Sequence, residues 1–356
     1  MSQKTIVTVA GARPQFIKAA PVSRALAGWF HEVLVHTGQH YDYGMSDVFF
    51  EEMEMRPPDF HLGVGGETHA KQTGKMLIEI EKVLNSVKPA YLLVYGDTNS
   101  TLAGALAAAK LHIPVAHVEA GLRSYNRAMP EEINRVVTDH VSSLLFCPTD
   151  AAIENLAKEG ITQGVERVGD VMYDALLHNL NLARQHSTIL LSLGLDKGKY
   201  ALATVHRAAN TDEPVRMTAI LDALGSLSSP VVFPVHPRTS KMIRELGLSI
   251  SGNVRLIEPV GHFDILILQE NASCILTDSG GMQKEAYLLG VRCITLREET
   301  EWVETVQAGW NRLTGVDGNA IRAAFESWHP SGARPALYGN GNAAEQICKI
   351  LSRELQ

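Results

Sequence analysis

Cysteine is scarce in this chain of 356 residues, and its four cysteines stand far apart: Cys147, Cys274, Cys293 and Cys348. No two of them have the short spacing of a zinc ligand pair or of a redox-active dithiol. The sequence therefore offers no cysteine-based metal or redox site. We expect four thiols buried in apolar surroundings.

Long hydrophobic runs and a basic excess are also lacking. The segment MSQKTIVTVAGARPQ enters a strand-like run without the long apolar stretch of a signal peptide, and no later run approaches the length of a membrane span. Lys and Arg number 32 against 39 Asp and Glu, a formal charge of -7, which argues against nucleic acid as a partner. We expect a cytoplasmic protein that contacts neither membrane nor nucleic acid.

Short β-branched segments alternate with longer segments of helical period, the pattern of parallel sheets with crossover helices. In the first half they predict an α/β order of strand 4–9, helix 15–27, strand 32–36, helix 68–87, strand 90–95, helix 99–111, strand 114–118, helix 131–144 and strand 145–148, the last closing the sheet. A transitional segment follows around 168–190. The pattern then restarts with strand 201–206, helix 213–227, strand 231–236, helix 239–247 and strands 254–257 and 274–277.

This length exceeds what one hydrophobic core usually supports, so we expect two domains with the active site in the cleft between them. We place the N-terminal domain, which carries the acid and base residues, at 1–172. The C-terminal domain follows at 173–340. Residues 341–356 have apolar positions at helical spacing and form a terminal helix that packs back on the first domain.

Ligands of open parallel sheets bind beyond the carboxyl ends of strands, so polar residues directly after strands are the first candidates. The first strand ends in GARP, which places Arg13 at the strand end and Lys18 about one and a half helical turns later. Both cations could face an anion. The segment lacks the dinucleotide GxGxxG pattern and the P-loop lysine, and a plain strand-to-helix turn would explain it equally well.

Three carboxylates follow later strands. Asp97 comes after the strand in YLLVYGD, Glu119 after that in PVAHVE, and Glu131 stands in the first turn of the helix begun by PEEINR. Each alone has a structural explanation, because Asp97 could cap a helix and acidic residues suit a first helical turn. Their occurrence together favours an acid–base site.

In the second half, two strands end in histidine, giving His206 with Arg207 and, later, His236. The stronger signal is CILTDSGGMQKEA, where a strand leads through Ser279, Gly280 and Gly281 into a helix that carries Glu285. Exposed backbone N–H groups and the dipole at such a helix start suit phosphate. Glu285 could accept hydrogen bonds from a ribose.

Eight segments, in this order along the chain, resemble the non-hydrolysing UDP-N-acetylglucosamine 2-epimerases: GARPQFIKAAP, TGQH, YGDTNSTLAG, HVEAGLRS, PEEINR, VHRAAN, PVHP and TDSGGMQKEA. The resemblance implies two Rossmann-like domains in a glycosyltransferase-B-like arrangement, usually as a homodimer, with a role in cell-surface polysaccharide biosynthesis. It implies a UDP-sugar substrate with UDP as partner, and neither a metal nor another cofactor.

Carried over by motif, the resemblance assigns catalysis to Asp97, Glu119, Glu131 and His206, and substrate binding to Arg13, Lys18, Arg207, His236, Ser279, Gly280, Gly281 and Glu285. The loop Val260–Ile265 is expected near uracil. The implied reaction removes the proton on carbon 2, expels UDP in an anti elimination to give a 2-acetamidoglucal, and adds UDP back after reprotonation on the opposite face. Which carboxylate removes the proton and which returns it stays open, because environment sets their pKa values.

Some positions depart from the common family pattern. Gln15 replaces a glutamate, Ala209 replaces the glutamate of HRxEN, and Asp170 stands where GN is usual. The loop SYNRAMP between Arg123 and Glu131 is shorter than in many members of the family, and TEWVETVQAGWN replaces the commoner TERPE pattern. These features resemble the branch that includes epimerases of UDP-2,3-diacetamido-2,3-dideoxyglucuronic acid. Arg127 or Arg123 could bind the carbon-6 carboxylate of that sugar.

Bacterial relatives often bind a second UDP-sugar as an activator. Gln39 and His40 match part of that site, whereas Asp42 and Lys71 depart from it. Other classes stay open as alternatives: a glycosyltransferase of the same fold, a non-catalytic nucleotide-sugar sensor, and a hydrolysing epimerase. The first would share the phosphate and ribose residues but would not need the three carboxylates, and the second would bind UDP-sugar without exchanging the hydrogen on carbon 2.

Overall fold

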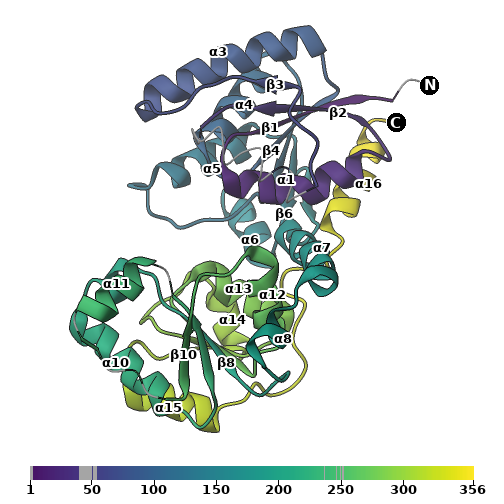
Figure 1. Ribbon diagram of the computed structural model, residues 1–356. Coiled ribbons are helices and arrows are strands. Elements are labelled where there is room, and N and C mark those ends of the chain that lie inside the picture. Colours follow the sequence, from purple (N-terminus) through teal and green to yellow (C-terminus); the bar gives the residue numbers. More distant parts are fainter. Residues whose placement is uncertain are drawn as a thin grey trace. The chain divides into compact units, whose positions relative to one another are not determined.

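A computed structural model describes residues 3–39, 50, 54–235, 237–245, 247–248, 250 and 252–356. The chain divides into two compact units, drawn in Figure 1. Unit 1 consists of Met1–Leu177 together with Ala336–Gln356, and unit 2 is His178–Pro335. Each contains a parallel sheet with helices on both faces, which confirms the predicted α/β fold class.

Unit 1 is built on a seven-stranded sheet in the order β3-β2-β1-β4-β5-β6-β7. Its strands are β1 (Thr5–Ala10), β2 (His31–His36), β3 (Phe60–His61), β4 (Tyr91–Tyr95), β5 (Val115–Val118), β6 (Leu144–Cys147) and β7 (Val165–Arg167). All neighbouring strands pair in parallel. The central strands are mostly apolar because helices bury both of their faces.

The helices of unit 1 are α1 (Arg13–Leu26), α3 (His69–Val87), α4 (Asn99–Lys110), α5 (Pro130–Val141), α6 (Asp150–Lys158), α7 (Val171–His186, which runs into unit 2) and α16 (Ala343–Glu354). Alternate residues of the strands point to opposite faces of the sheet. One set packs with α1 and α16, and the other packs with α3 and α4. Figure 1 shows α1 and α16 side by side, and the two helices are in contact.

Unit 2 has a six-stranded parallel sheet in the order β10-β9-β8-β11-β12-β13. Its strands are β8 (Ala201–Thr204), β9 (Val231–Pro234), β10 (Val254–Ile257), β11 (Cys274–Thr277), β12 (Cys293–Thr295) and β13 (Asn311–Leu313). Its helices are α8 (Ile189–Leu193), α9 (Ala208–Thr211), α10 (Pro214–Gly225), α11 (Pro237–Glu245), α12 (His262–Glu270), α13 (Gly280–Leu289), α14 (Val303–Gln307) and α15 (Gly318–Ser327). Helices α10, α11 and α15 contribute to the core on one face, and α8, α12 and α13 to that on the other.

Three predictions about individual segments are wrong. Strand β6 does not close its sheet, because β7 pairs with its outer edge. The transitional segment 168–190 contains the regular helix α7, which begins directly after Gly169 and Asp170. The expected loop Val260–Ile265 becomes helical at His262, because HFDILILQE buries its apolar residues as α12.

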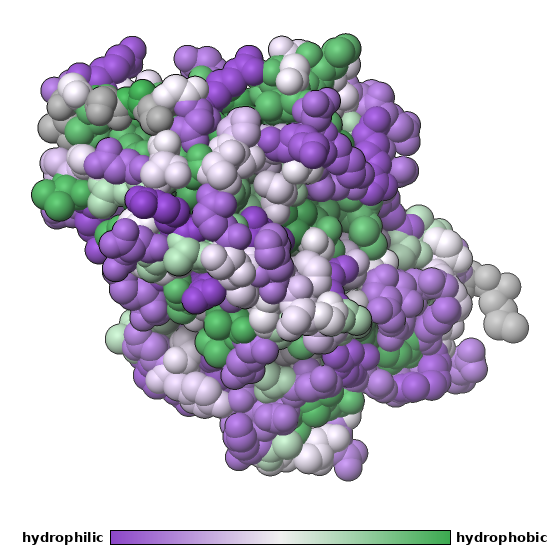
Figure 2. All heavy atoms as spheres, turned by 90° about the horizontal axis from the view of Figure 1, so that it is seen from below, coloured by the Kyte–Doolittle hydropathy of each residue, from purple (hydrophilic) through white to green (hydrophobic). Residues whose placement is uncertain are grey.

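All four cysteines are free thiols and buried, as the sequence predicts. Burial raises the pKa of the Cys274 thiol to about 12, so it stays protonated at neutral pH. Among the described residues, no helix is both long and apolar enough to cross a membrane. On the face drawn in Figure 2, hydrophilic and hydrophobic residues are intermixed.

Candidate active site

The strand order of each sheet reverses at one point, and that point is where α/β sheets bind ligands. In unit 1 it lies between β1 and β4, since β1 pairs with β2 on one side and with β4 on the other. In unit 2 it lies between β8 and β11 for the same reason. The predicted site residues follow the carboxyl ends of these strands and of their neighbours.

Lys18 and Glu119 form an ion pair in unit 1. Lys18 comes from α1, and Glu119 follows the end of β5; their side chains are 16% and 14% exposed. Burial by itself lowers the pKa of the Lys18 ammonium, but the attraction of Glu119, with a smaller contribution from Asp97, raises that pKa above its usual value. The pair therefore presents a fixed positive charge beside a carboxylate.

Asp97 directly follows the turn after β4 and pairs with Arg135 of α5. Their side chains are 32% and 15% exposed, so both are accessible from solvent. Asn134, the preceding residue of α5, donates its amide to the Asp97 backbone oxygen at 2.9 Å. Helix α5 thus holds both the main chain and the carboxylate of Asp97.

Gly96 brings these two groups together. A Cβ atom at this position would lie 3.2 Å from the Lys18 Nζ and 3.3 Å from the Glu119 Oε2, and the residue has a φ of +62°. The turn that presents Asp97 therefore passes in contact with the Lys18–Glu119 pair. Glycine allows this approach because it has no side chain and tolerates the left-handed backbone.

Glu131 and Arg13 are placed less directly. Glu131 is exposed near the start of α5, the helix that also carries Arg135, and it makes no ion pair with any residue in the described part of the chain. Arg13 is the exposed first residue of α1, three residues after the end of β1. The structure thus brings together Lys18, Asp97 and Glu119, and it places Arg13 and Glu131 near the starts of the helices that carry Lys18 and Arg135.

Gln15 stands where the family pattern usually has a glutamate. It is buried, and both the oxygen and the nitrogen of its side-chain amide form hydrogen bonds. Its Oε1 accepts from the backbone N–H groups of Gly11 and Ala12 at 2.9 and 3.1 Å. Its Nε2 donates at 3.0 Å to the Tyr95 backbone oxygen and at 3.0 Å to the Thr101 hydroxyl. It thereby ties the end of β1 to the end of β4, one residue before the Gly96 turn.

In unit 2, Asp278 holds the loop that carries His206 and Arg207. Asp278 follows β11, is fully buried, and accepts the backbone N–H groups of both residues at 3.1 Å. It also accepts the Asn210 side-chain amide at 3.0 Å. The histidine and arginine side chains themselves remain 55% and 43% exposed, so the backbone is fixed while both side chains stay available to a ligand.

The start of α13 lies beside this loop, because Asp278 directly precedes it. Ser279 is the N-cap and accepts the Met282 N–H. A Cβ at Gly280 would lie 1.9 Å from a carboxylate oxygen of Glu301, so the backbone passes close to that side chain. That oxygen is also 3.8 Å from Arg207. A carboxylate thus lies beside the helix start and near an arginine, and a helix start with exposed N–H groups is a favourable environment for an anion.

Glu285 is part-buried in α13 and accepts the Gln269 amide at 2.9 Å. Burial raises the pKa of its carboxyl group, although the Gln269 hydrogen bond and the charge of Lys284 counteract this. His236 lies outside the described residues, as do His40 and Asp42.

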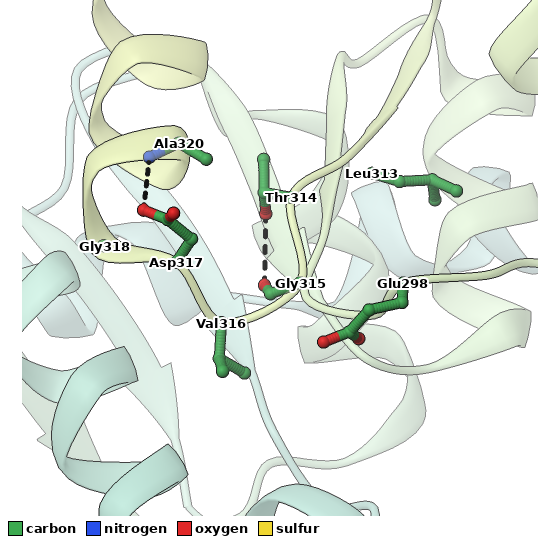
Figure 3. A pocket seen from close by; sticks show the side chains of 8 residues that line it. All are labelled: Glu298, Leu313, Thr314, Gly315, Val316, Asp317, Gly318 and Ala320. Atoms are coloured by element: carbon green, nitrogen blue, oxygen red, sulfur yellow. Dashed lines mark hydrogen bonds between the residues drawn. The ribbon is translucent and has the colours of Figure 1, made fainter.

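A separate pocket of unit 2, shown in Figure 3, lies at the end of β13 and the start of α15. Among its lining residues are Glu298 and Asp317, and the Asp317 carboxylate already accepts the N–H groups of Asn319 and Ala320 at the start of α15. Its carboxylates do not suit an anionic ligand. None of the predicted site residues lines it.

The sequence did not predict the residues that fix the backbone of the site loops without forming the site themselves. They are mostly buried polar groups: His117, Asn134, Asp139, Asn210 and Asp278. Their signal is a polar residue inside or beside an otherwise apolar strand, as in VAHV, or on the buried side of a helix, as in PEEINRVVTDHV. Such a residue must find a partner, but its partner cannot be identified without the fold.

Comparisons with known proteins give consistent matches over nearly the whole chain. A family model described as UDP-N-acetylglucosamine 2-epimerase matches residues 24–352. A UDP-N-acetylglucosamine 2-epimerase homolog of Methanococcus maripaludis is 51% identical, over 97% of this chain and 99% of its own. The UDP-2,3-diacetamido-2,3-dideoxy-D-glucuronate 2-epimerase of Pseudomonas aeruginosa is 48% identical, over 98% and 99%. The Methanocaldococcus jannaschii UDP-GlcNAc 2-epimerase, solved with UDP-GlcNAc and UDP, has a TM-score of 0.75 and 43% identity, covering 99% of this chain and 100% of that one.

Proposed function

The chain belongs to the UDP-N-acetylglucosamine 2-epimerase family, and from that premise we propose that it interconverts UDP-N-acetylglucosamine and UDP-N-acetylmannosamine without releasing free sugar. The proposal assigns the sugar to the carboxylates of unit 1 and the UDP moiety to the start of α13 in unit 2. Solved relatives hold UDP-GlcNAc and UDP, which supports a nucleotide-sugar substrate.

The observation that carries the proposal is the concentration of charged groups after β1, β4 and β5. Asp97 and Glu119 each have a cation as partner, and the Gly96 turn lies in contact with one of these pairs. Inverting a carbon atom requires a group that takes a proton and another that returns one. A nucleotide-binding protein without chemistry would need the phosphate residues of unit 2 but no such set.

In the proposed reaction, a carboxylate removes the proton on carbon 2 while the bond between carbon 1 and the UDP oxygen breaks. The electron pair of the C–H bond becomes the C1–C2 double bond of a 2-acetamidoglucal, and the electron pair of the C–O bond leaves with UDP. Arg207 and the N–H groups at the start of α13 stabilise the phosphate charge that develops. Carbon 2 is then protonated on the opposite face, and UDP adds back to carbon 1.

We assign the proton transfers to Asp97, Glu119 and Glu131 as a set. Arg135 and Lys18 orient the first two through their ion pairs. His206, held through its backbone by Asp278, is assigned to catalysis beside the departing UDP. Arg13 joins Lys18 as a substrate-binding cation, and His236 joins the substrate-binding set. Glu285 is assigned to the ribose. Gln269 donates to one of its carboxylate oxygens, and the other oxygen can accept a hydrogen bond from a ribose hydroxyl.

A second substrate is the 2,3-diacetamido uronate sugar, because a relative at 48% identity is named for it. Of the two arginines that the sequence suggests for its carboxylate, Arg123 has a side chain only 1% exposed that already binds Asp139 and Glu159. Arg127 is exposed and remains the candidate. If it binds that carboxylate, Arg127→Ala will lower kcat/KM for the uronate and leave the neutral sugar unaffected.

The experiment that tests the function is proton NMR of purified protein with each UDP-sugar in deuterated water. The proposal expects deuterium at carbon 2, appearance of the manno epimer and retention of UDP. A glycosyltransferase or a nucleotide-sugar sensor would bind UDP without exchange at carbon 2, and a hydrolysing epimerase would accumulate free sugar. Absence of exchange with both sugars would refute the proposal.

A further inference from the structure

A buried charge network lies directly behind the carboxylates of unit 1. His117 is the third residue of β5 and is fully buried, and its neighbours in the network are Asp139 of α5 and Arg123. Arg123 in turn holds Glu159 through two hydrogen bonds of 2.7 and 2.9 Å. No step of the proposed reaction uses these four residues, yet burying such charges is costly unless each is paired.

The ring of His117 lies between two elements. Its Nδ1 lies 2.7 Å from an oxygen of Asp139, and its Nε2 lies 2.7 Å from the backbone oxygen of Gly96. Both partners are hydrogen-bond acceptors. The imidazole therefore bridges the Asp139 carboxylate of α5 and the Gly96 turn.

Asp139 contacts the turn on the far side of Glu119. Besides His117, it accepts the Gly121 N–H at 3.1 Å and Arg123 at 2.7 Å. Burial alone raises the pKa of the Asp139 carboxyl group, but the charges and hydrogen bonds of His117 and Arg123 lower it below its usual value. One carboxylate thus binds both the second residue before Glu119 and the second residue after it.

Glu119 itself needs this support. Its φ of +71° lies in the left-handed region, which a residue with a side chain rarely adopts. Such a conformation persists only where the surroundings impose it. Here Asp139 holds the turn from both sides, and the N–H groups of Glu119 and Ala120 both donate to the Phe146 backbone oxygen at 3.1 Å.

Resting on the proposed function, we infer that the buried, hydrogen-bonded His117–Asp139 pair positions both Asp97 and Glu119 for catalysis. His117 holds the Gly96 oxygen and hence the turn that presents Asp97, while Asp139 holds the strained turn that presents Glu119. The pair couples the two carboxylate-bearing turns through one rigid unit. Neither residue touches substrate; both are positioning residues.

The first test separates positioning from stability. His117→Phe keeps the ring volume but removes both hydrogen bonds, so we expect kcat to fall about 10- to 100-fold. The dissociation constant of UDP stays within about twofold, because UDP is assigned to unit 2. Val115→Ala in the same strand is the control, since Val115 is a buried core residue without a hydrogen-bonding side chain. It lowers the melting temperature and leaves kcat within about twofold.

Two conservative variants assign the contacts. His117→Gln places an amide near the Gly96 oxygen, and His117→Asn places one near Asp139, so each restores part of the kcat lost in His117→Phe. A kcat of His117→Phe that matches Val115→Ala at equal thermal stability would overturn the inference.

The second test does not depend on activity. Nitrogen-15 NMR of imidazole-labelled full-length protein should show the ring nitrogens of His117 in hydrogen bonds to Asp139 and to the Gly96 oxygen, the His117 signals being identified by their loss in His117→Gln. A ring that shows neither hydrogen bond would overturn the inference even in an active enzyme. If wild-type protein lacks exchange at carbon 2 but shows these hydrogen bonds, the proposed function fails while the coupling of the two turns stands.

Discussion

Replacing Asp278 by asparagine should weaken UDP binding in addition to lowering the stability of unit 2. The buried carboxylate accepts the N–H groups of His206 and Arg207 and the amide of Asn210. Asparagine has one accepting oxygen, and its NH₂ group would face donors, so at least one hydrogen bond to a charged acceptor is lost. Such bonds contribute about 1.5–3 kcal/mol each. We therefore expect unit 2 to lose about 2–4 kcal/mol of unfolding free energy.

The effect on UDP follows from the loop that Asp278 holds. Once the backbone of Arg207 is free to move, the guanidinium must be ordered again on binding, and we expect the dissociation constant of UDP to rise about tenfold or more, equivalent to about 1.4 kcal/mol. Calorimetric titration with UDP, paired with thermal unfolding, measures both quantities on one preparation.

Asp317→Ala is the matched control in the same unit. Asp317 accepts two backbone N–H groups at the start of α15, so its loss should cost about 1 kcal/mol of stability. It should leave UDP binding unchanged. If Asp278→Asn bound UDP within twofold of wild type despite a lower melting temperature, the assignment of a positioning role to Asp278 would be refuted.

Three further predictions concern unit 1. Glu131→Gln should leave the melting temperature within about 1 °C, because the exposed side chain has no ion-pair partner in the described part of the chain. The same change should reduce deuterium exchange at carbon 2 by about 100-fold or more. Retained exchange would remove Glu131 from the catalytic set. Gly96→Ala should cost about 1–2 kcal/mol, since its φ is +62°, and should lower kcat by displacing Lys18; an unchanged kcat would contradict this. Burial lowers the pKa of His36 to about 4, below its value in the unfolded chain. The contribution of His36 to the unfolding free energy is therefore complete above about pH 6.5 and is lost as the pH falls towards 4, by about 2 kcal/mol at pH 5. The urea midpoint of the wild-type protein should show this loss between pH 7 and pH 5, and that of His36→Asn should not.

Most strands were predictable because both faces of a parallel sheet are buried, which makes each strand a largely apolar run. The central strand 274–277 and the edge strand 254–257 were predicted with their observed limits. Strand β3 has two residues and β7 and β13 have three each, too few to create a pattern. They form because a neighbouring strand offers its edge, as β6 does to Val165–Arg167. That pairing is a tertiary property.

The candidate site divides in the same way. Residues that follow strands, such as Asp97 and Glu119, are visible in sequence because parallel strands place their carboxyl ends together. What sequence does not show is that Asp97 meets Arg135, or that Glu119 meets Lys18, because those partners come from helices packed on opposite faces of the sheet. Gln15 shows the limit most clearly: its four hydrogen bonds follow only from the approach of β1 and β4.

The return of α16 to unit 1 has a consequence for how the protein is made. Ile347, Cys348 and Leu351 belong to the same core as Phe16 of α1, although unit 2 lies between them in the sequence. On the ribosome, the whole of unit 2 therefore emerges before unit 1 has received its last helix. The half of the protein that is synthesised first must wait with part of its core exposed, and it is the half that is finished last.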